Sequence, residues 1–287
     1  MIYKKYCLLL LGIFSVCNLL QAQYQSYQAK GELGIGVGSS TYFGDLNPSG
    51  KVTPIHYSAG AFYQKYFSNY IGVRLSANYI HLHASDADSK NIAYKTRNLN
   101  FSNNMLEMSL TGSFNFFNYA PGFSGHNFTP YVSLGIGTVY SNPYTFDDEG
   151  KKVYLRSLGT EGQKSTTSHD GKKYGPFAMV FPLSVGVRQA LSQRINLFAE
   201  VGYRFTTTDY LDDASTTYAG ASAFDAANYK GSPTQASIAK QLQDRSQNQS
   251  LGIKGWQRGN SAVKDSYLLM QIGISYNFSN CNCPGVF

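Results

Sequence analysis

The stretch IGVRLSANYIHLH, residues 71–83, decides the fold class of this chain. Apolar residues such as Ile71 and Val73 alternate along it with small or polar residues such as Gly72 and Arg74. A period of two places successive side chains on opposite faces of a β-strand. One face of this strand is therefore apolar, and the other is small and polar.

Seven other stretches follow the same alternation, most clearly INLFAEVGYRF, MLEMSLTGSFNF and YLLMQIGISYNF. The sequence therefore predicts eight strands, at about 32–42, 56–67, 71–84, 103–116, 130–140, 177–189, 194–206 and 266–278. Each is close to the ~9–11 residues that a tilted strand needs to cross a membrane. The even number of strands suits an antiparallel barrel.

The lengths of the connections separate a membrane barrel from a soluble β-sandwich. Ser68-Asn69 and Leu191–Gln193 are tight turns, whereas 85–101, 141–176 and 207–265 are long and polar. Short turns on one rim and long loops on the other are typical of outer-membrane barrels. We predict an all-β fold, an eight-stranded antiparallel transmembrane β-barrel with short periplasmic turns and long extracellular loops.

The N-terminal segment has the pattern of a secretory signal peptide at residues 1–22. Lys4 and Lys5 precede a short apolar run, and Ala22 is a small residue at a plausible cleavage point. We expect residues 23–287 to form the barrel, in the bacterial outer membrane. The net charge is +7, but the basic residues are scattered, so no nucleic-acid partner is expected.

The predicted inward face carries three acids and three arginines: Glu32, Glu107, Glu200, Arg74, Arg188 and Arg204. An unpaired charge in a low-dielectric interior is costly, so we expect these residues to form a charge network. Eight strands leave an interior just wide enough for side chains to fill. The sequence therefore predicts a plugged lumen rather than a selective pore, with no small-molecule substrate and no cofactor.

One outward-facing group raises the possibility of an enzyme. His81, His83 and Ser85 lie at the outer end of the third strand, and His83/Ser85 resembles the site of outer-membrane lipid A deacylases. Such a site also needs an acid that orients the histidine. The acid of the next strand, Glu107, is on the inward face. We therefore expect a protein that is not an enzyme, with a lipid-modifying enzyme as the alternative.

The stretch TDYLDD, residues 208–213, places Asp209, Asp212 and Asp213 at the start of the longest outer loop. Calcium binds several oxygens in a compact loop, so the three aspartates are a weak metal candidate. They lack EF-hand spacing, and local turn formation by Asp side chains is the simpler interpretation. Later in this loop, Ser232 and Pro233 have the pattern of a helix start. The remainder is small and polar, and we expect it to be mobile.

Several stretches together resemble PorG-like proteins, which are outer-membrane barrels of the type IX secretion system. They are ELGIGVGSSTYFGDLNP (32–48), NFFNYAP (115–121), TPYVSLGIG (129–137), TDYLDDAS (208–215) and SYNFSNCNCPGVF (275–287). The resemblance implies a non-enzymatic component that tethers or organises a periplasmic ring at the outer membrane. That ring belongs to a protein-export machinery, with gliding as a further possible role. A passive structural or adhesin barrel is a third alternative.

Two segments at the periplasmic end are longer than a barrel needs, namely the turn 117–128 and the tail 279–287. We expect them to dock periplasmic ring proteins, with these candidate residues: Asn118, Tyr119, Pro121, Cys281, Cys283 and Pro284. The two cysteines could pair with each other or with another protein. A frayed terminus is the simpler interpretation of the tail.

Overall fold

A computed structural model describes residues 31–48, 50, 52, 55–167 and 171–278. The expected signal peptide at 1–22 and the tail at 279–287 lie outside these residues. None of the helices in the described ranges is long and apolar enough to cross a membrane.

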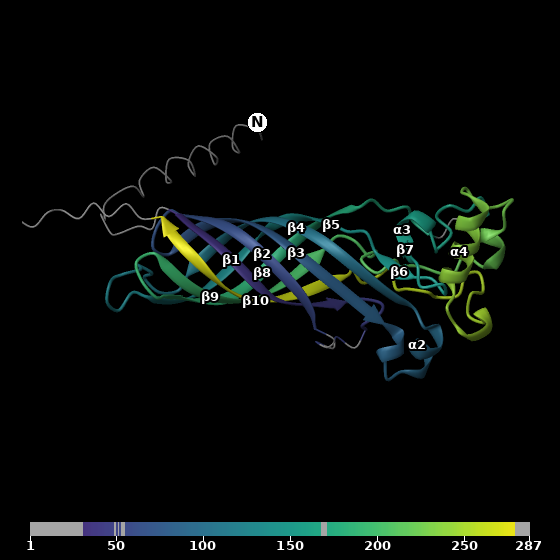
Figure 1. Ribbon diagram of the computed structural model, residues 1–287, viewed down its shortest axis with the longest axis horizontal. Coiled ribbons are helices and arrows are strands. Elements are labelled where there is room, and N and C mark those ends of the chain that lie inside the picture. The colour runs from purple at the N-terminus through teal and green to yellow at the C-terminus, as the bar shows by residue number, and fades with distance from the viewer. Residues whose placement is uncertain (1–30, 49, 51, 53–54, 168–170, 279–287) are drawn as a thin grey trace, which may run out of the picture.

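Eight long strands form a closed barrel (Figure 1). They are β1 (Gly31–Phe43), β2 (His56–Tyr66), β3 (Ile71–Ser85), β4 (Asn100–Asn115), β5 (Phe128–Tyr140), β8 (Phe177–Ala190), β9 (Ile195–Thr206) and β10 (Ser266–Phe278). Each pairs antiparallel with its neighbour in the order β3-β2-β1-β10-β9-β8-β5-β4, and β3 pairs with β4 to close the circle. The predicted fold class is confirmed.

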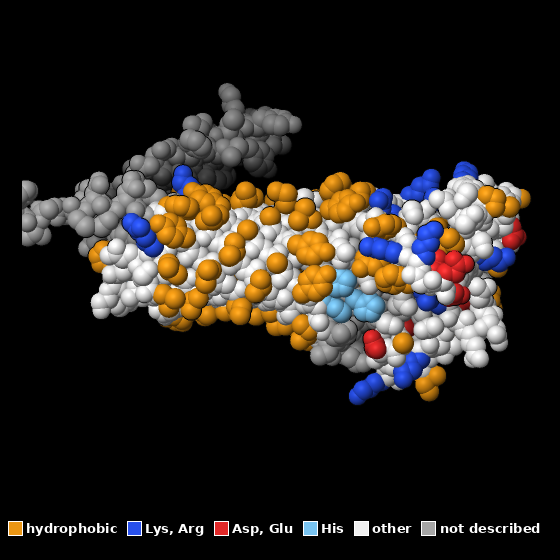
Figure 2. Space-filling view, in the orientation of Figure 1, with side chains coloured by type: hydrophobic (Ala, Val, Ile, Leu, Met, Phe, Trp, Pro, Cys, Tyr) orange, Lys and Arg blue, Asp and Glu red, His pale blue; other side chains and the backbone are white. Residues whose placement is uncertain are grey.

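Alternation along the strands sorts the side chains between the outside and the lumen. In β3, Ile71 and Leu75 are about half exposed, whereas Arg74 is buried. Figure 2 shows the resulting apolar band along the barrel. Exposed aromatic residues gather near both ends of the strands: Tyr63, Phe114, Phe128 and Tyr276 at one, and Tyr57, Tyr79, Tyr140, Phe177 and Phe205 at the other. An apolar band between two aromatic girdles is what a lipid bilayer requires of a barrel exterior.

The connections form two sets, one at each end of the barrel (Figure 1), and the turn 116–127 is as long as the outer loop 44–55. The turns 67–70, 116–127 and 191–194 lie at one end, together with the start of β1 and the end of β10. The four outer loops 44–55, 86–99, 141–176 and 207–265 lie at the other end. We call the described residues of these four loops the cap.

The cap contains its own short elements, which the alternation pattern could not predict. They are η1 (Asp86–Asp88), α2 (Ile92–Arg97), β6 (Tyr144–Phe146), β7 (Lys152–Tyr154), α3 (Leu155–Leu158), η2 (Ala221–Phe224), α4 (Pro233–Gln243) and η3 (Gln247–Gln249). Helix α4 begins where the sequence indicated: Ser232 forms a capping box with Gln235, and Pro233 is its first residue.

The cap has a packed apolar core, although its sequence is rich in small polar residues. Leu155, Leu158, Leu211, Phe224 and Leu242 are almost fully buried and belong to one cluster with residues at the outer ends of the strands. Its few large apolar residues converge from separate loops, so the described part of the cap is packed through contacts that are distant in sequence.

Candidate functional site

The six inward charges form three ion pairs inside the barrel. The nitrogen–oxygen distances are 2.7, 3.5 and 3.5 Å for Arg74–Glu200, Arg188–Glu32 and Arg204–Glu107 respectively. All six residues are buried. Each arginine therefore has a carboxylate as its counter-charge in a region that excludes bulk water.

Hydroxyl and amide groups complete the coordination of these carboxylates. Tyr66 and Ser275 donate hydrogen bonds to Glu32, and Arg188 donates to the Tyr66 hydroxyl. Tyr131 donates to Glu200 over 2.8 Å, and Tyr267 donates to Glu107 over 2.6 Å. A buried carboxylate is tolerated when its oxygens are bonded in this way. The four strands that supply the donors are thus linked across the lumen.

Bulky side chains fill the remaining space. The guanidinium carbon of Arg74 lies 4.2 Å from the centre of the Phe62 ring, and Phe62 packs edge-to-face on Phe198. Gly34 leaves room for the Phe62 ring, since a Cβ at this position would collide with it. A cavity beside these residues has a volume of about 20 Å³. That is room for about one water molecule, so the lumen is plugged at this level.

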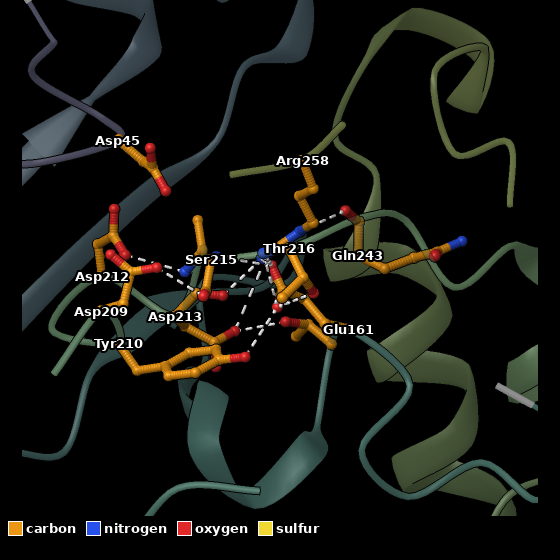
Figure 3. A network of polar contacts seen from close by, with 12 residues as sticks. Asp45, Glu161, Asp209, Tyr210, Asp212, Asp213, Ser215, Thr216, Gln243 and Arg258 are labelled. Carbon is orange, nitrogen blue, oxygen red and sulfur yellow. Dashed lines mark hydrogen bonds and ion pairs between the residues drawn. The ribbon is translucent and has the colours of Figure 1, made fainter. Parts of the chain in front are cut away.

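The three aspartates of TDYLDD lie in the cap, within one network of polar contacts (Figure 3). All three are buried. Their oxygens accept hydrogen bonds from different hydroxyl groups: Ser215 donates to Asp209, Tyr42 to Asp212, and Thr160 and Tyr174 to Asp213. Among the described residues, no group of three or more His, Cys, Asp or Glu side chains is arranged to hold a metal ion. These carboxylates thus accept hydrogen bonds from hydroxyl groups, and the weak metal candidate stays a prediction.

The protonation of this acidic centre is shifted. Burial, with repulsion from Asp45, raises the pKa of Asp209 to about 7. Burial and repulsion from Asp45 raise the pKa of Asp212 well above its usual range, and burial and Asp212 do the same to the pKa of Asp265. The Tyr42 hydroxyl lies 2.6 Å from Asp212 and 2.8 Å from Asp265. One hydroxyl proton cannot serve two carboxylates at once, so one of these aspartates carries a proton.

Glu161 and Arg258 hold the two longest loops together (Figure 3). Arg258 Nη1 lies 3.1 Å from Glu161 Oε1 and also donates to the backbone carbonyl of Asp213. The backbone N–H groups of Ser215 and Thr216 donate to Glu161 over 2.8 and 3.1 Å. No sequence pattern indicates this pair. Its members are 97 residues apart, in segments without periodicity.

Arg97 links the remaining outer loops to this centre. Its Nε and Nη2 atoms donate to the two carboxylate oxygens of Asp86, each over 2.7 Å. It also donates to the backbone carbonyls of Asp45 and Arg258. The four outer loops are therefore joined by buried charge-assisted hydrogen bonds, which are stronger than neutral ones.

His83 and Ser85 are not hydrogen-bonded to each other. His83 Nδ1 lies 3.0 Å from the hydroxyl oxygen of Ser102 on the neighbouring strand. The Ser85 hydroxyl accepts a hydrogen bond from the backbone N–H of Ala87. Within the described ranges, no carboxylate is hydrogen-bonded to either residue. The geometry therefore lacks the histidine–serine contact and the orienting acid of a hydrolase.

The histidines instead form a surface patch at the outer edge of the apolar band, shown in pale blue in Figure 2. The His56 ring lies 5.5 Å from the His81 ring and 5.6 Å from the His83 ring. His81 stacks on Tyr57 and bonds to Asn104 over 2.6 Å. Polar aromatic rings at this level suit a boundary between lipid and water.

The turn between β4 and β5 folds partly into the barrel mouth. Tyr119 and Pro121, two of the expected docking residues, are buried. The Tyr119 ring lies 5.6 Å from the guanidinium carbon of Arg188, and Asn118 accepts a hydrogen bond from Asn69. Tyr119 therefore packs beside a lumen residue, and the docking role of Asn118, Tyr119 and Pro121 stays a prediction. The remaining candidates, Cys281, Cys283 and Pro284, lie outside the described residues.

Different residues of the same turn are exposed. Phe117 and Phe123 are each about half exposed, and Leu191 on the adjacent turn is exposed as well. The two turns are neighbours, since a Cβ on Gly122 would contact the side chain of Gln193. We call Phe117, Phe123 and Leu191 the periplasmic ledge. The alternation of apolar and polar residues could not identify them, because residues of a turn do not alternate between an inward and an outward face.

A family model described as a domain of unknown function (DUF6089) matches residues 8–231 of the chain. No curated protein matches it at a significant level.

Solved structures of small barrels resemble the chain at low identity. The N-terminal β-barrel domain of OprF from Pseudomonas aeruginosa is 9% identical, with a TM-score of 0.37, and the match covers 88% of this chain and 100% of that one. Neisserial surface protein A is 9% identical, with a TM-score of 0.41 and the same coverage. OprG from Pseudomonas aeruginosa is 12% identical, with a TM-score of 0.38, covering 90% of this chain and 100% of that one. At such low identity the likeness is one of fold alone.

Proposed function

This chain belongs to the DUF6089 family, and from that premise we propose that it is a non-enzymatic outer-membrane component of a type IX protein secretion machinery. In this role the barrel sits in the bacterial outer membrane, surrounded by lipid. Its periplasmic end tethers or organises a ring of periplasmic proteins. The resemblance of its sequence stretches to PorG-like proteins supports the assignment to this machinery.

The periplasmic ledge is the observation that carries the docking role. Phe117, Phe123 and Leu191 expose apolar surface on turns beyond the strands. Exposed aromatic residues are enriched at protein–protein interfaces. Tyr119 anchors this turn against Arg188 inside the mouth, so the ledge is held in place before a partner arrives.

The lumen and the outer surface support a role without catalysis. Three ion pairs and their tyrosine partners fill the lumen, which leaves little space for a substrate. His83 bonds to Ser102 rather than Ser85. Because a lipid-modifying enzyme would need a different arrangement at this site, it is the second candidate and not the first.

The test is to delete the gene and restore it with matched variants. Phe117→Ser with Phe123→Ser alters the ledge, and Phe146→Ser with Ile253→Ser alters two similarly exposed residues in the cap. We expect deletion to abolish export, and the ledge variant to export poorly and to lose its ring partners in detergent pull-downs. The cap variant should behave as the wild type. All variants should keep the heat-modifiable gel mobility of a folded barrel.

Two results would overturn the proposal. Normal export after deletion would indicate a passive structural or adhesin barrel. A change in lipid A acylation after deletion, reproduced by Ser85→Ala, would indicate the enzyme.

A further inference from the structure

The cap contains a pocket of about 700 Å³ whose rim is cationic. Arg156, Lys164 and Lys173 line it from the loop 141–176, and Lys230 lines it from the loop 207–265. The backbone N–H of Lys230 donates to the carbonyl of Lys164 over 2.9 Å, so the two loops are joined at the pocket. The pocket is thus built by tertiary contacts and does not belong to one loop alone.

The four cations differ from the buried arginines of the cap in their pairing. Among the described residues, none of them forms an ion pair, whereas the buried arginines of the cap, Arg97 and Arg258, are both paired. No acid is among the described residues that line the pocket. Cations of one sign around a concave surface focus a positive potential within it.

Gln163 also lines the pocket. Its Oε1 accepts a hydrogen bond from the backbone N–H of Glu161 over 2.9 Å, which fixes the orientation of the amide.

The acids nearest Tyr174 in the pocket wall are bonded to other groups. Tyr174 lines the pocket and stacks on Tyr210, with ring centres 4.3 Å apart. Behind it, Tyr174 donates to Asp213, while Arg258 pairs with Glu161 and lies near Asp213. These acids are therefore occupied by their own partners.

We propose that this pocket binds a polyanionic glycan outside the cell, one that carries several sulfate, phosphate or carboxylate groups. A volume of about 700 Å³ suits a ligand of sugar size rather than a single ion. The helix α3, which carries Arg156, lies in the part of the cap that projects beyond the barrel (Figures 1 and 2). This site is independent of the docking role of the periplasmic end.

Binding can be measured with the full-length barrel in detergent, using calorimetry. The probes are a multiply sulfated disaccharide, the same disaccharide without sulfate, and inorganic sulfate. We expect the sulfated disaccharide to bind and the other two to bind at least about tenfold more weakly, since several charge-assisted contacts act together. Affinity should fall as salt rises.

Charge reversal locates the site. Lys173→Glu with Lys230→Glu should weaken binding by at least about tenfold, because both contacts become repulsive. The control, Lys90→Glu with Lys95→Glu, makes the same change in net charge on exposed residues of another loop and should leave affinity within about threefold. Heat-modifiable mobility checks that each variant is folded.

The proposal fails if the unsulfated disaccharide or inorganic sulfate binds as tightly as the sulfated one. It also fails if the pocket and control variants lose affinity equally, or if folded pocket variants bind like the wild type.

Discussion

The lumen and the cap both bury many charged side chains, but they balance them differently. In the lumen, three carboxylates face three arginines. In the cap, the buried acids outnumber the buried arginines: Asp86, Glu161, Asp209, Asp212, Asp213, Asp244 and Asp265 against Arg97 and Arg258. The lumen network is therefore held by ionised pairs, whereas the cap network needs bound protons as well. This difference predicts that the two regions respond differently to mutation and to pH.

The largest effect is expected from breaking a lumen pair. Arg188→Met leaves Glu32 buried without its counter-charge, and removing one partner of a buried pair costs about 3 to 5 kcal/mol. We expect the whole barrel to lose that much stability in urea-induced unfolding, followed by heat-modifiable mobility.

The double variant Arg188→Met with Glu32→Gln is the control, because it removes both charges together. It should recover much of the lost stability. If the double variant is as unstable as the single one, the charge pair is not what stabilises the lumen.

A smaller and more local effect is expected from the matching change in the cap. Arg258→Met leaves Glu161 and Asp213 without their guanidinium group. The loops 141–176 and 207–265 should then exchange backbone amide hydrogens faster and be cleaved by protease, while the barrel keeps its heat-modifiable mobility. Loss of the barrel itself would contradict the separation of the two networks.

The cap should also loosen as pH rises. A carboxyl whose pKa is higher in the folded state than in the unfolded state does not destabilise the fold below about pH 4, because it is protonated in both states there. As pH rises, the Asp209 carboxyl ionises in the open cap before it ionises in the closed cap. The closed cap therefore loses stability until the pH reaches the pKa of Asp209, at about 7. Hydrogen exchange in the cap should therefore accelerate across this range, while exchange in the strands changes little.

Asp209→Asn removes one of the groups responsible and keeps an oxygen for the Ser215 hydroxyl. It should flatten the pH dependence, whereas Asp88→Asn, at an exposed position, should not. An unchanged pH profile in Asp209→Asn would show that this carboxyl does not control the cap.

The smallest expected effect concerns helix α4. Ser232 accepts from the backbone N–H of Gln235, and replacing such a cap by alanine typically costs about 1 kcal/mol. Ser232→Ala should raise hydrogen exchange in residues 233–243 and leave the rest of the cap nearly unchanged. Equal exchange in wild type and variant would mean that tertiary packing alone holds this helix.

The same contrast explains what the sequence could reveal. In the strands, a period of two assigns each residue to the lumen or to lipid, so Glu32, Arg74 and their partners can be identified from the sequence alone. The cap has no such period. Glu161 and Arg258 meet through loops, and nothing in their local sequence indicates a partner. The inward position of Tyr119 could not be predicted for the same reason, since residues of a turn do not alternate between two faces.

The role proposed for the periplasmic end can be tested most directly by site-specific photocrosslinking in intact cells. A photoreactive residue at Phe123 of the ledge is compared with one at Phe146 of the cap, which is equally exposed. The account predicts a crosslink from position 123 to a periplasmic protein of the secretion ring, and none from position 146. A folded barrel that gives no ring crosslink from position 123, in cells that export normally, would contradict it.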